Sequence, residues 1–162
     1  MSATGTDHDA EGIIPFFVYG TLMMSDGGED RWIDDVIRVE RNLIVCGYSL
    51  YITHGSFPYA MEVDSPDEYV FGELLWPRND VAAGLMTKRL DQIEGHPSFY
   101  RRTLVDVTRN SRSTQQAWMY VYPIGNCWDP MQLVPIGASW RVWQSNHPHV
   151  RGAGAWRGSA YV

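Results

Sequence analysis

The chain alternates short apolar runs with polar turns, and most of the runs are of the length and composition that predict β-strands. Residues 13–18 form an apolar run before Gly20 and predict a buried first strand. Residues 38–53 are rich in Val, Ile, Leu and Tyr and predict a long strand region. Further strands are expected at 59–63, 69–76, 103–108 and 117–122.

One segment has a helical period instead. Asn79 or Asp80 is a suitable N-cap, and Gly95 followed by Pro97 ends the pattern. The apolar residues between these limits recur at close to helical spacing and predict one buried stripe. The expected stripe consists of Val81, Leu85, Met86, Leu90 and Ile93.

Two shorter helices are expected on weaker patterns. Asp30 is a potential cap for a short helix that carries Trp32, Ile33, Val36 and Ile37 on one side, and residues 139–145 form a second candidate. Because strands dominate and one helix is clear, the pattern predicts an α+β domain with a curled, mostly antiparallel sheet.

The ends of the chain differ in composition from its middle. Residues 1–12 are small and acidic and predict a disordered leader without the apolar stretch of a signal peptide. Residues 13–145 carry the periodic patterns and predict one domain. Residues 146–162 form a Gly-rich C-terminal tail.

Composition and charge narrow the function classes. The 162 residues are 44% hydrophobic, which supplies a core without crosslinks or metals. Acidic residues outnumber basic ones by 19 to 13, so we expect no nucleic-acid partner. The excess of acid is compatible with a cationic or amine-bearing ligand. We also expect no membrane interaction, because no run approaches the ~20 apolar residues of a membrane helix.

The two cysteines, Cys46 and Cys127, have neither a zinc-binding nor a redox spacing. Cys46 follows an apolar run and predicts a buried thiol. This usage is typical of a reducing compartment, so we expect a cytoplasmic protein.

Glu94 is the first candidate for chemistry. It ends the predicted helix beside the apolar stripe, where the negative end of the helix dipole and partial burial would both raise its pKa towards neutrality. Such a carboxyl group is suited to general acid/base catalysis. Asp91 faces the same way and is a rival. The alternative is that Glu94 is an ordinary solvated glutamate at a helix end.

The other candidates come from turns and strand ends. Tyr19-Gly20-Thr21-Leu22 follows the first strand, and a sharp turn there would direct backbone N–H groups at a ligand. Arg101 and Arg102 are potential partners for Glu94 or for a ligand carboxylate. Each feature also has a purely structural explanation. The same holds for the loop Gly55-Ser56-Phe57-Pro58-Tyr59 and for Trp118, Tyr120 and Tyr122 on one strand face.

Metal and nucleotide chemistry is not expected. His147 and His149 have no third ligand nearby, so no metal site is predicted. The glycines at 152, 154 and 158 miss the dinucleotide-binding spacing, and the chain has no Walker loop and no nucleophile elbow.

Taken together and in this order, several short motifs resemble the γ-glutamylcyclotransferase-like family, which includes the AIG2-like proteins. The resemblance covers roughly residues 16–122. A weaker likeness, Trp140-Arg141-Val142-Trp143, follows, although Ala138-Ser139 stands where Gly-Asp is common in the family. The carrying motifs are Phe17-Val18-Tyr19-Gly20-Thr21-Leu22, Gly47-Tyr48-Ser49-Leu50-Tyr51, Gly55-Ser56-Phe57-Pro58, Val70-Phe71-Gly72-Glu73-Leu74, Leu90-Asp91-Gln92-Ile93-Glu94-Gly95, Tyr100-Arg101-Arg102 and Ala117-Trp118-Met119-Tyr120.

The resemblance implies a small mixed fold, a barrel-like sheet flanked by helices, with a cavity at the end of the first strand. It implies that Glu94 is the catalytic acid/base and that Tyr19, Gly20, Thr21 and Leu22 bind the γ-glutamyl group. Further substrate-binding residues are expected at Pro58 and Tyr120.

The expected reaction cyclises a γ-glutamyl amide to 5-oxoproline and releases an amine, without metal or cofactor. The released amine stays open among an amino acid, a lysine side chain, a polyamine and an aminoglycoside. Two other functions also stay open, a non-catalytic binding module and a hydrolase that releases glutamate. A homodimer is a further expectation, because exposed tryptophans near Trp128, Trp140 and Trp156 would make an apolar face. The alternative is that these tryptophans form the rim of the substrate site.

Overall fold

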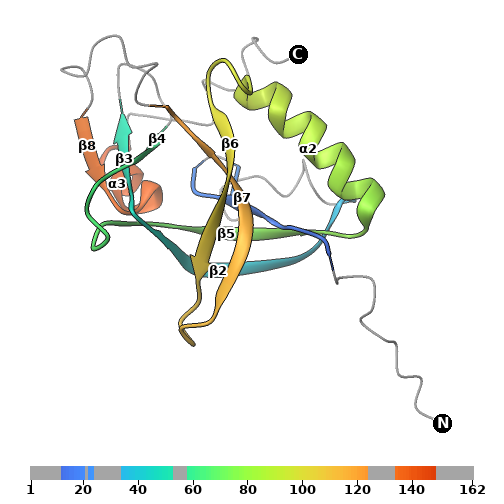
Figure 1. Cartoon of the computed structure of the whole chain (residues 1–162). Coiled ribbons are helices and arrows are strands. Elements are labelled where there is room, and N and C mark those ends of the chain that lie inside the picture. The colour runs from blue at the N-terminus through green and yellow to red at the C-terminus, as the bar shows by residue number, and fades with distance from the viewer. Residues whose placement is uncertain (1–11, 21, 24–33, 53–57, 124–133, 149–162) are drawn as a thin grey trace.

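The computed structural model describes residues 12–20, 22–23, 34–52, 58–123 and 134–148. In these residues the chain forms a barrel, a small sheet and two helices, arranged as Figure 1 shows. This arrangement confirms the expected α+β class. The elements in chain order are β1 (Phe16–Val18), β2 (Val36–Cys46), β3 (Tyr48–Ile52), β4 (Tyr59–Glu62), β5 (Tyr69–Pro77), α2 (Asp80–Glu94), β6 (Arg101–Thr108), β7 (Thr114–Val121), β8 (Val134–Gly137) and α3 (Trp140–Asn146).

The barrel closes in the strand order β1-β5-β2-β6-β7. Its neighbours are antiparallel except for β1 and β7, which run parallel with Phe16 opposite Trp118 and Phe17 opposite Met119. This parallel pairing places the residues after Val18 beside the end of β7. The end of the first strand, where a site is expected, therefore lies against Tyr120.

The second sheet has the order β4-β3-β8 and lies with α3 on the side of the barrel away from α2 (Figure 1). Gly47, with φ of 83°, separates β2 from β3 and redirects the chain from the barrel to this sheet. The expected single strand region 38–53 is therefore two strands in two sheets. β8 was not expected at all.

The core fills the barrel and the space under α2. β5 is buried on both faces from Gly72 to Pro77, because one face lines the barrel and the other is covered by neighbouring segments that include α2. Its residues Leu74 and Leu75 are fully buried, as are Phe16 and Phe17 of β1. No helix in the described ranges has the length and apolar character needed to cross a membrane.

Helix α2 begins where the sequence predicts it, and Asn79 caps it by accepting a hydrogen bond from the Ala82 N–H at 2.8 Å. The predicted apolar stripe is wrong at two positions, because Val81 is 72% and Leu85 54% exposed. The face that packs against the barrel is one position further round the helix. It consists of Ala82, Met86, Leu90 and Glu94.

Two other expectations are wrong. Val36 and Ile37 do not belong to a helix, because β2 begins at Val36 and pairs with β5 there. Cys46 is exposed, since it ends β2 with its side chain outside the barrel. The expected cap at Asp30, the leader up to residue 11, Cys127 and the tail from 149 lie outside the described residues. The domain boundaries at 12 and 145 stay predictions.

Candidate functional site

Glu94 ends α2 on the face that packs against the barrel. The residue is only 8% exposed. It follows Leu90 by one helical repeat on the buried face, so the apolar residues of that face carry the carboxylate inward. Gly95 ends the helix in the left-handed conformation with φ of 65°, which a glycine adopts without strain. The helix therefore ends directly after Glu94.

Tyr19 lies beside Glu94 and connects three segments. Its hydroxyl donates to the Tyr120 carbonyl oxygen at 2.7 Å and accepts from the Ala60 N–H at 3.4 Å. Burial raises the pKa of the Tyr19 hydroxyl well above its usual value, and the negative charge of Glu94 raises it further. Tyr19 therefore stays protonated and neutral next to the carboxylate.

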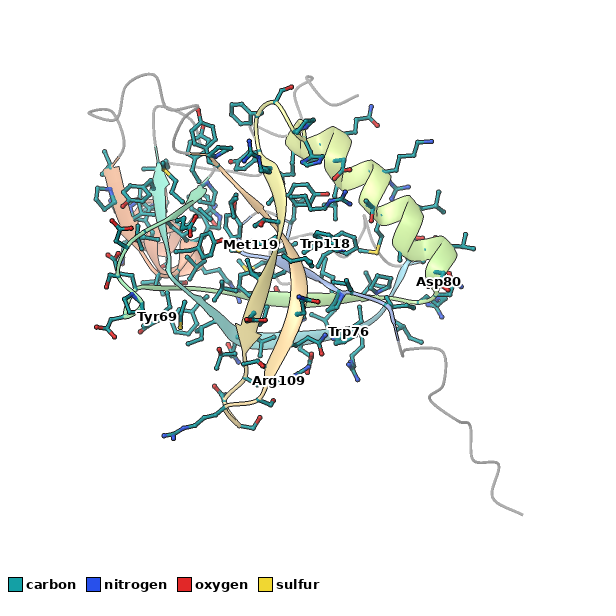
Figure 2. All side chains as sticks on the ribbon, viewed as in Figure 1. Tyr69, Trp76, Asp80, Arg109, Trp118 and Met119 are labelled. Carbon is teal, nitrogen blue, oxygen red and sulfur yellow. The ribbon has the colours of Figure 1, made fainter. Side chains whose placement is uncertain are left out.

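Tyr120 is held by a polar cluster on α2 and β6. Its hydroxyl donates to Asp91 Oδ1 at 2.5 Å, and Arg102 Nε lies 3.6 Å from the same oxygen. The Arg102 guanidinium also lies 4.8 Å above the Trp118 ring, which projects between β7 and α2 (Figure 2). Burial raises the pKa of the Tyr120 hydroxyl, and the hydrogen bond to Asp91 and the charge of Glu94 add to this. This hydroxyl is therefore also a fixed donor.

Gly20 and Pro58 bring the first turn and the start of β4 together. A Cβ atom built on Gly20 would lie 3.0 Å from Pro58 Cγ, so a side chain at residue 20 would push the two segments apart. The turn after Gly20 is closed by the Met23 N–H, which donates to the Gly20 carbonyl at 3.1 Å. The Tyr100 hydroxyl donates to the Pro58 carbonyl at 3.1 Å, and the Tyr100 N–H to the Glu94 carbonyl at 3.1 Å.

The structure thus brings together five positions that sequence reasoning singled out, namely Tyr19, Gly20, Pro58, Glu94 and Tyr120. Leu22 is buried in the turn that follows Gly20. Thr21 and residues 55–57 lie outside the described residues. Arg101 is exposed, whereas Arg102 belongs to the cluster around Asp91. Within the part of the chain that the structure describes, no His, Cys, Asp and Glu side chains group into a metal site.

Sequence reasoning missed two connections in this site. Asp91 was recognised only as a rival of Glu94, although it accepts the hydrogen bond of Tyr120. Tyr100 joins the end of α2 to Pro58, a link between residues 42 positions apart. The three-residue spacing from Asp91 to Glu94 could have indicated that both carboxylates face β7. Nothing in the sequence indicates which tyrosine Asp91 would meet.

The arrangement combines one buried carboxylate with two tyrosine hydroxyls whose protons are committed to other acceptors. Glu94 is therefore the group suited to exchange a proton with a ligand, and the tyrosines shape the space around it. Gly20, which has no side chain, allows the backbone of this turn to lie against Pro58.

Comparisons with known proteins identify the family of this chain. Residues 16–142 match the model of the family described as gamma-glutamyl cyclotransferase, AIG2-like. A protein of Methanocaldococcus jannaschii, provisionally named a gamma-glutamylcyclotransferase, is 28% identical over 107 residues, which cover 66% of this chain and 82% of that protein.

Solved structures support the fold. A solution structure of an Arabidopsis thaliana protein has a TM-score of 0.60 at 19% identity and covers 89% of each chain. The crystal structure of a mouse AIG2-like protein has a TM-score of 0.53 at 21% identity, covering 74% of this chain and 82% of that one. Because the family model matches most of the chain, this chain belongs to the gamma-glutamyl cyclotransferase, AIG2-like family.

Proposed function

We propose that this protein is an enzyme that cyclises a γ-glutamyl amide to 5-oxoproline and releases the amine, with Glu94 as general acid/base. The observation that carries the proposal is the burial of the Glu94 carboxylate, 8% exposed, beside Tyr19 and Tyr120 at the end of the first strand. A solvated glutamate at a helix end, the alternative explanation, would not be buried in this way.

The chemistry removes two protons from the α-amino nitrogen. Glu94 accepts the first from the α-ammonium group of the substrate, and the free amine then attacks the γ-carbonyl carbon. A C–N bond forms and closes a five-membered ring, and the ring nitrogen loses the second proton to water. When the original amide C–N bond breaks, Glu94 returns the first proton to the departing nitrogen. Because both reacting groups belong to one molecule, the protein accelerates the reaction mainly by selecting the folded conformer.

The negative charge that develops on the γ-carbonyl oxygen needs hydrogen-bond donors. We assign this role to the backbone N–H groups of residues 20–22, since backbone amides are effective when they are fixed in place before the reaction. Two observations support this assignment. The turn is closed at 3.1 Å by the Met23 N–H, and the Gly20 backbone packs closely against Pro58, which fixes its position.

Membership of the family does not identify the amine that is released. To identify it, the protein is incubated with a panel of γ-glutamyl amides that differ in their amine, and the products are analysed by mass spectrometry. Release of 5-oxoproline from at least one member, lost in Glu94→Gln, is expected. Release of glutamate would replace the proposal with a hydrolase. Binding of panel members without any product would replace it with a binding module.

The test needs a check that the variant folds. Glu94→Gln keeps the shape of the side chain, so we expect an unchanged circular dichroism spectrum and melting temperature. A folded Glu94→Gln with wild-type turnover would overturn the assignment of Glu94. In that case Asp91, one helical turn earlier, would be tested next.

A further inference from the structure

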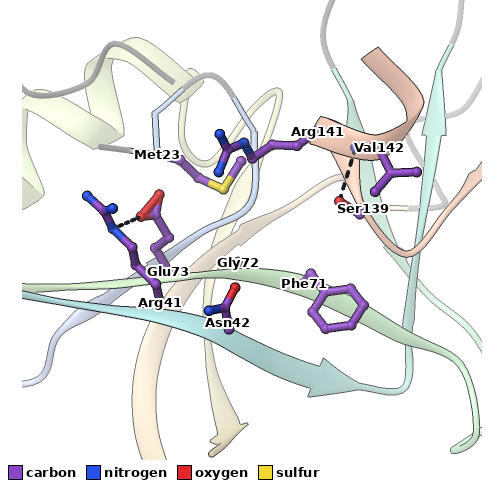
Figure 3. A pocket seen from close by; sticks show the side chains of 9 residues that line it. All are labelled: Met23, Arg41, Asn42, Phe71, Gly72, Glu73, Ser139, Arg141 and Val142. Atoms are coloured by element: carbon purple, nitrogen blue, oxygen red, sulfur yellow. Dashed lines mark hydrogen bonds and ion pairs between the residues drawn. The ribbon is translucent and has the colours of Figure 1, made fainter. Parts of the chain in front are cut away.

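A cavity of about 270 Å³ lies between the barrel and α3 (Figure 3). It is bordered by β2, β5 and the turn that follows Gly20. None of the residues that gather around Glu94 lines it. Its volume is just below the ~300–1,000 Å³ that is usual for ligand pockets, so it suits a small molecule. The nine lining residues are Met23, Arg41, Asn42, Phe71, Gly72, Glu73, Ser139, Arg141 and Val142.

The wall formed by β2 and β5 contains an ion pair between a buried carboxylate and a half-exposed arginine. Glu73 is only 3% exposed, and Arg41 Nε lies 3.5 Å from its Oε2 atom. Arg41 contacts this carboxylate through one nitrogen, and its side chain is 54% exposed. Its other guanidinium nitrogens therefore remain able to donate to a ligand.

Arg141 supplies a second guanidinium group from α3. In Figure 3 its side chain extends towards Met23 and the side of the cavity where Arg41 and Glu73 lie. Among the described residues it forms no ion pair and no side-chain hydrogen bond. Among the described lining residues, two arginines and one glutamate give one net positive charge, in a chain whose formal charge is −6. A local reversal of this kind favours a ligand with one negative charge.

The local backbone is built to present these groups. The pairing of β2 with β5 shifts register between Glu40 and Leu43, and Asn42 there has φ of 59°. In a regular strand Arg41 and Asn42 would face opposite sides of the sheet. At this irregularity both line the same cavity, which is a recognised use of β-bulges.

Apart from Ser139 and Gly72, the rest of the described lining is apolar. Phe71 and Val142 are 40% and 62% exposed on the cavity rim, and the buried Met23 closes one wall. We propose that this cavity is a second binding site, which takes a small organic monocarboxylate with an apolar body. The carboxylate lies between Arg41 and Arg141, and the body covers Phe71 and Val142. Glu73 disfavours a dianion such as phosphate through like-charge repulsion.

The proposal is tested by titrating the full chain with 3-phenylpropionate and following backbone amide shifts by NMR. We expect saturable shifts at Arg41, Phe71, Glu73, Arg141 and Val142. The uncharged analogue 3-phenylpropanol should bind about tenfold more weakly, because it lacks the charge-assisted hydrogen bonds.

Arg141→Gln is the decisive variant, because Arg141 is exposed and its loss leaves the Arg41–Glu73 pair in place. It should weaken 3-phenylpropionate binding about tenfold. The matched control is Arg101→Gln, an exposed arginine outside the cavity, which should bind as wild type. Equal affinity of Arg141→Gln and wild type, absence of saturation, or shifts confined to the surroundings of Glu94 would each overturn the proposal. No outcome depends on the cyclotransferase reaction.

Discussion

At the scale of single residues, Glu94 shows how apolar packing positions a charge. Three apolar residues, Ala82, Met86 and Leu90, precede it at intervals of four on the buried face of α2. Burial of these three side chains is favourable and fixes the rotation of α2 about its own axis. Glu94 is therefore buried although burial of a carboxylate is costly. The position of the carboxylate is thus determined by apolar residues on the same face of the helix.

Asp91 and Glu94 are both carboxylates, and variants of each should separate proton transfer by Glu94 from the positioning of Tyr120 by Asp91. Glu94→Gln should lower kcat/KM by about 10²–10⁴-fold, the usual range for loss of a general acid/base. Asp91→Asn should cost about tenfold or less, because the amide oxygen still accepts the Tyr120 hydrogen bond, which typically contributes about 1 kcal/mol.

Steady-state kinetics of both variants and of Asp91→Ala check this. Asp91→Ala removes the acceptor and should cost more than Asp91→Asn. If Asp91→Asn and Glu94→Gln lost activity equally, the assignment of proton transfer to Glu94 alone would be wrong.

Gly72 is required by close packing between β5 and β1. A Cβ atom there would lie 2.4 Å from the Val18 carbonyl oxygen and 2.5 Å from the Phe17 ring. Gly72→Ala should therefore lower the free energy of unfolding by about 1–3 kcal/mol or more, as overpacking does. Gly84→Ala is the matched control. That site is exposed in α2 with nothing within 4 Å, so alanine should raise the free energy of unfolding by up to ~1 kcal/mol. Urea denaturation measures both, and a neutral Gly72→Ala would contradict the packing.

The individual site positions were predictable only in part. The motif around Glu94 and the turn after Tyr19 are local in sequence, and a family resemblance identifies them. The contacts of Tyr19 with Ala60 and of Gly20 with Pro58 join segments about 40 residues apart. Such contacts depend on strand pairing across the barrel, which no local pattern specifies.

At the scale of elements, the edge of the barrel near the β6–β7 turn is held by one carboxylate. Glu40 of β2 accepts two hydrogen bonds from Arg109, each 3.0 Å, and one from Trp76 Nε1 at 2.9 Å. Trp76 and Arg109 are labelled in Figure 2. The two-pronged contact joins β2 to the residue that follows β6.

This carboxylate predicts a pH dependence of stability. The hydrogen bonds from Arg109 hold the pKa of Glu40 below its usual value of 4.5 in the folded chain. A lowered folded-state pKa stabilises the fold above pH 4.5, and this stabilisation is lost as the pH falls through the folded pKa. The difference in unfolding free energy between wild type and Glu40→Gln should thus shrink below pH 4.5.

Urea denaturation between pH 3 and 7 measures this difference. Arg109→Gln should behave as Glu40→Gln does, and the double variant should be little worse than either single one. A difference that stayed constant down to pH 3 would contradict the role of Glu40.

The elements with strong patterns were predictable, and those with ambiguous patterns were not. β5 and α2 have long apolar runs or clear caps, and they were located to within one residue. β8 contains Pro135 and pairs only at a sheet edge, so its sequence resembles coil. The predicted stripe of α2 is wrong at Val81 and Leu85, because these two residues are as apolar as the residues that face the barrel.

At the scale of the whole molecule, the two sheets differ in how firmly they are held. β5 pairs with β1 on one side and β2 on the other, whereas β8, within the described ranges, pairs with β3 alone and lies at the edge of its sheet. The barrel also contains most of the fully buried side chains. The barrel should therefore be the more stable part of the fold.

Native-state hydrogen exchange tests this order. The amides of Leu74 and Leu75 should exchange at least about tenfold more slowly than those of Val134 and Ile136 in β8. NMR-detected exchange at neutral pH gives the rates residue by residue. Equal protection of β8 and β5 would mean that the second sheet and the barrel open as one unit.

The Tyr19 hydroxyl connects these two parts, because it accepts from β4 of the small sheet and donates to β7 of the barrel. One atom therefore serves both the cohesion of the two sheets and the surroundings of Glu94. A substitution that removes this hydroxyl takes away a hydrogen bond from each sheet and changes the environment of Glu94 in one step, so the two effects are not separable at this position.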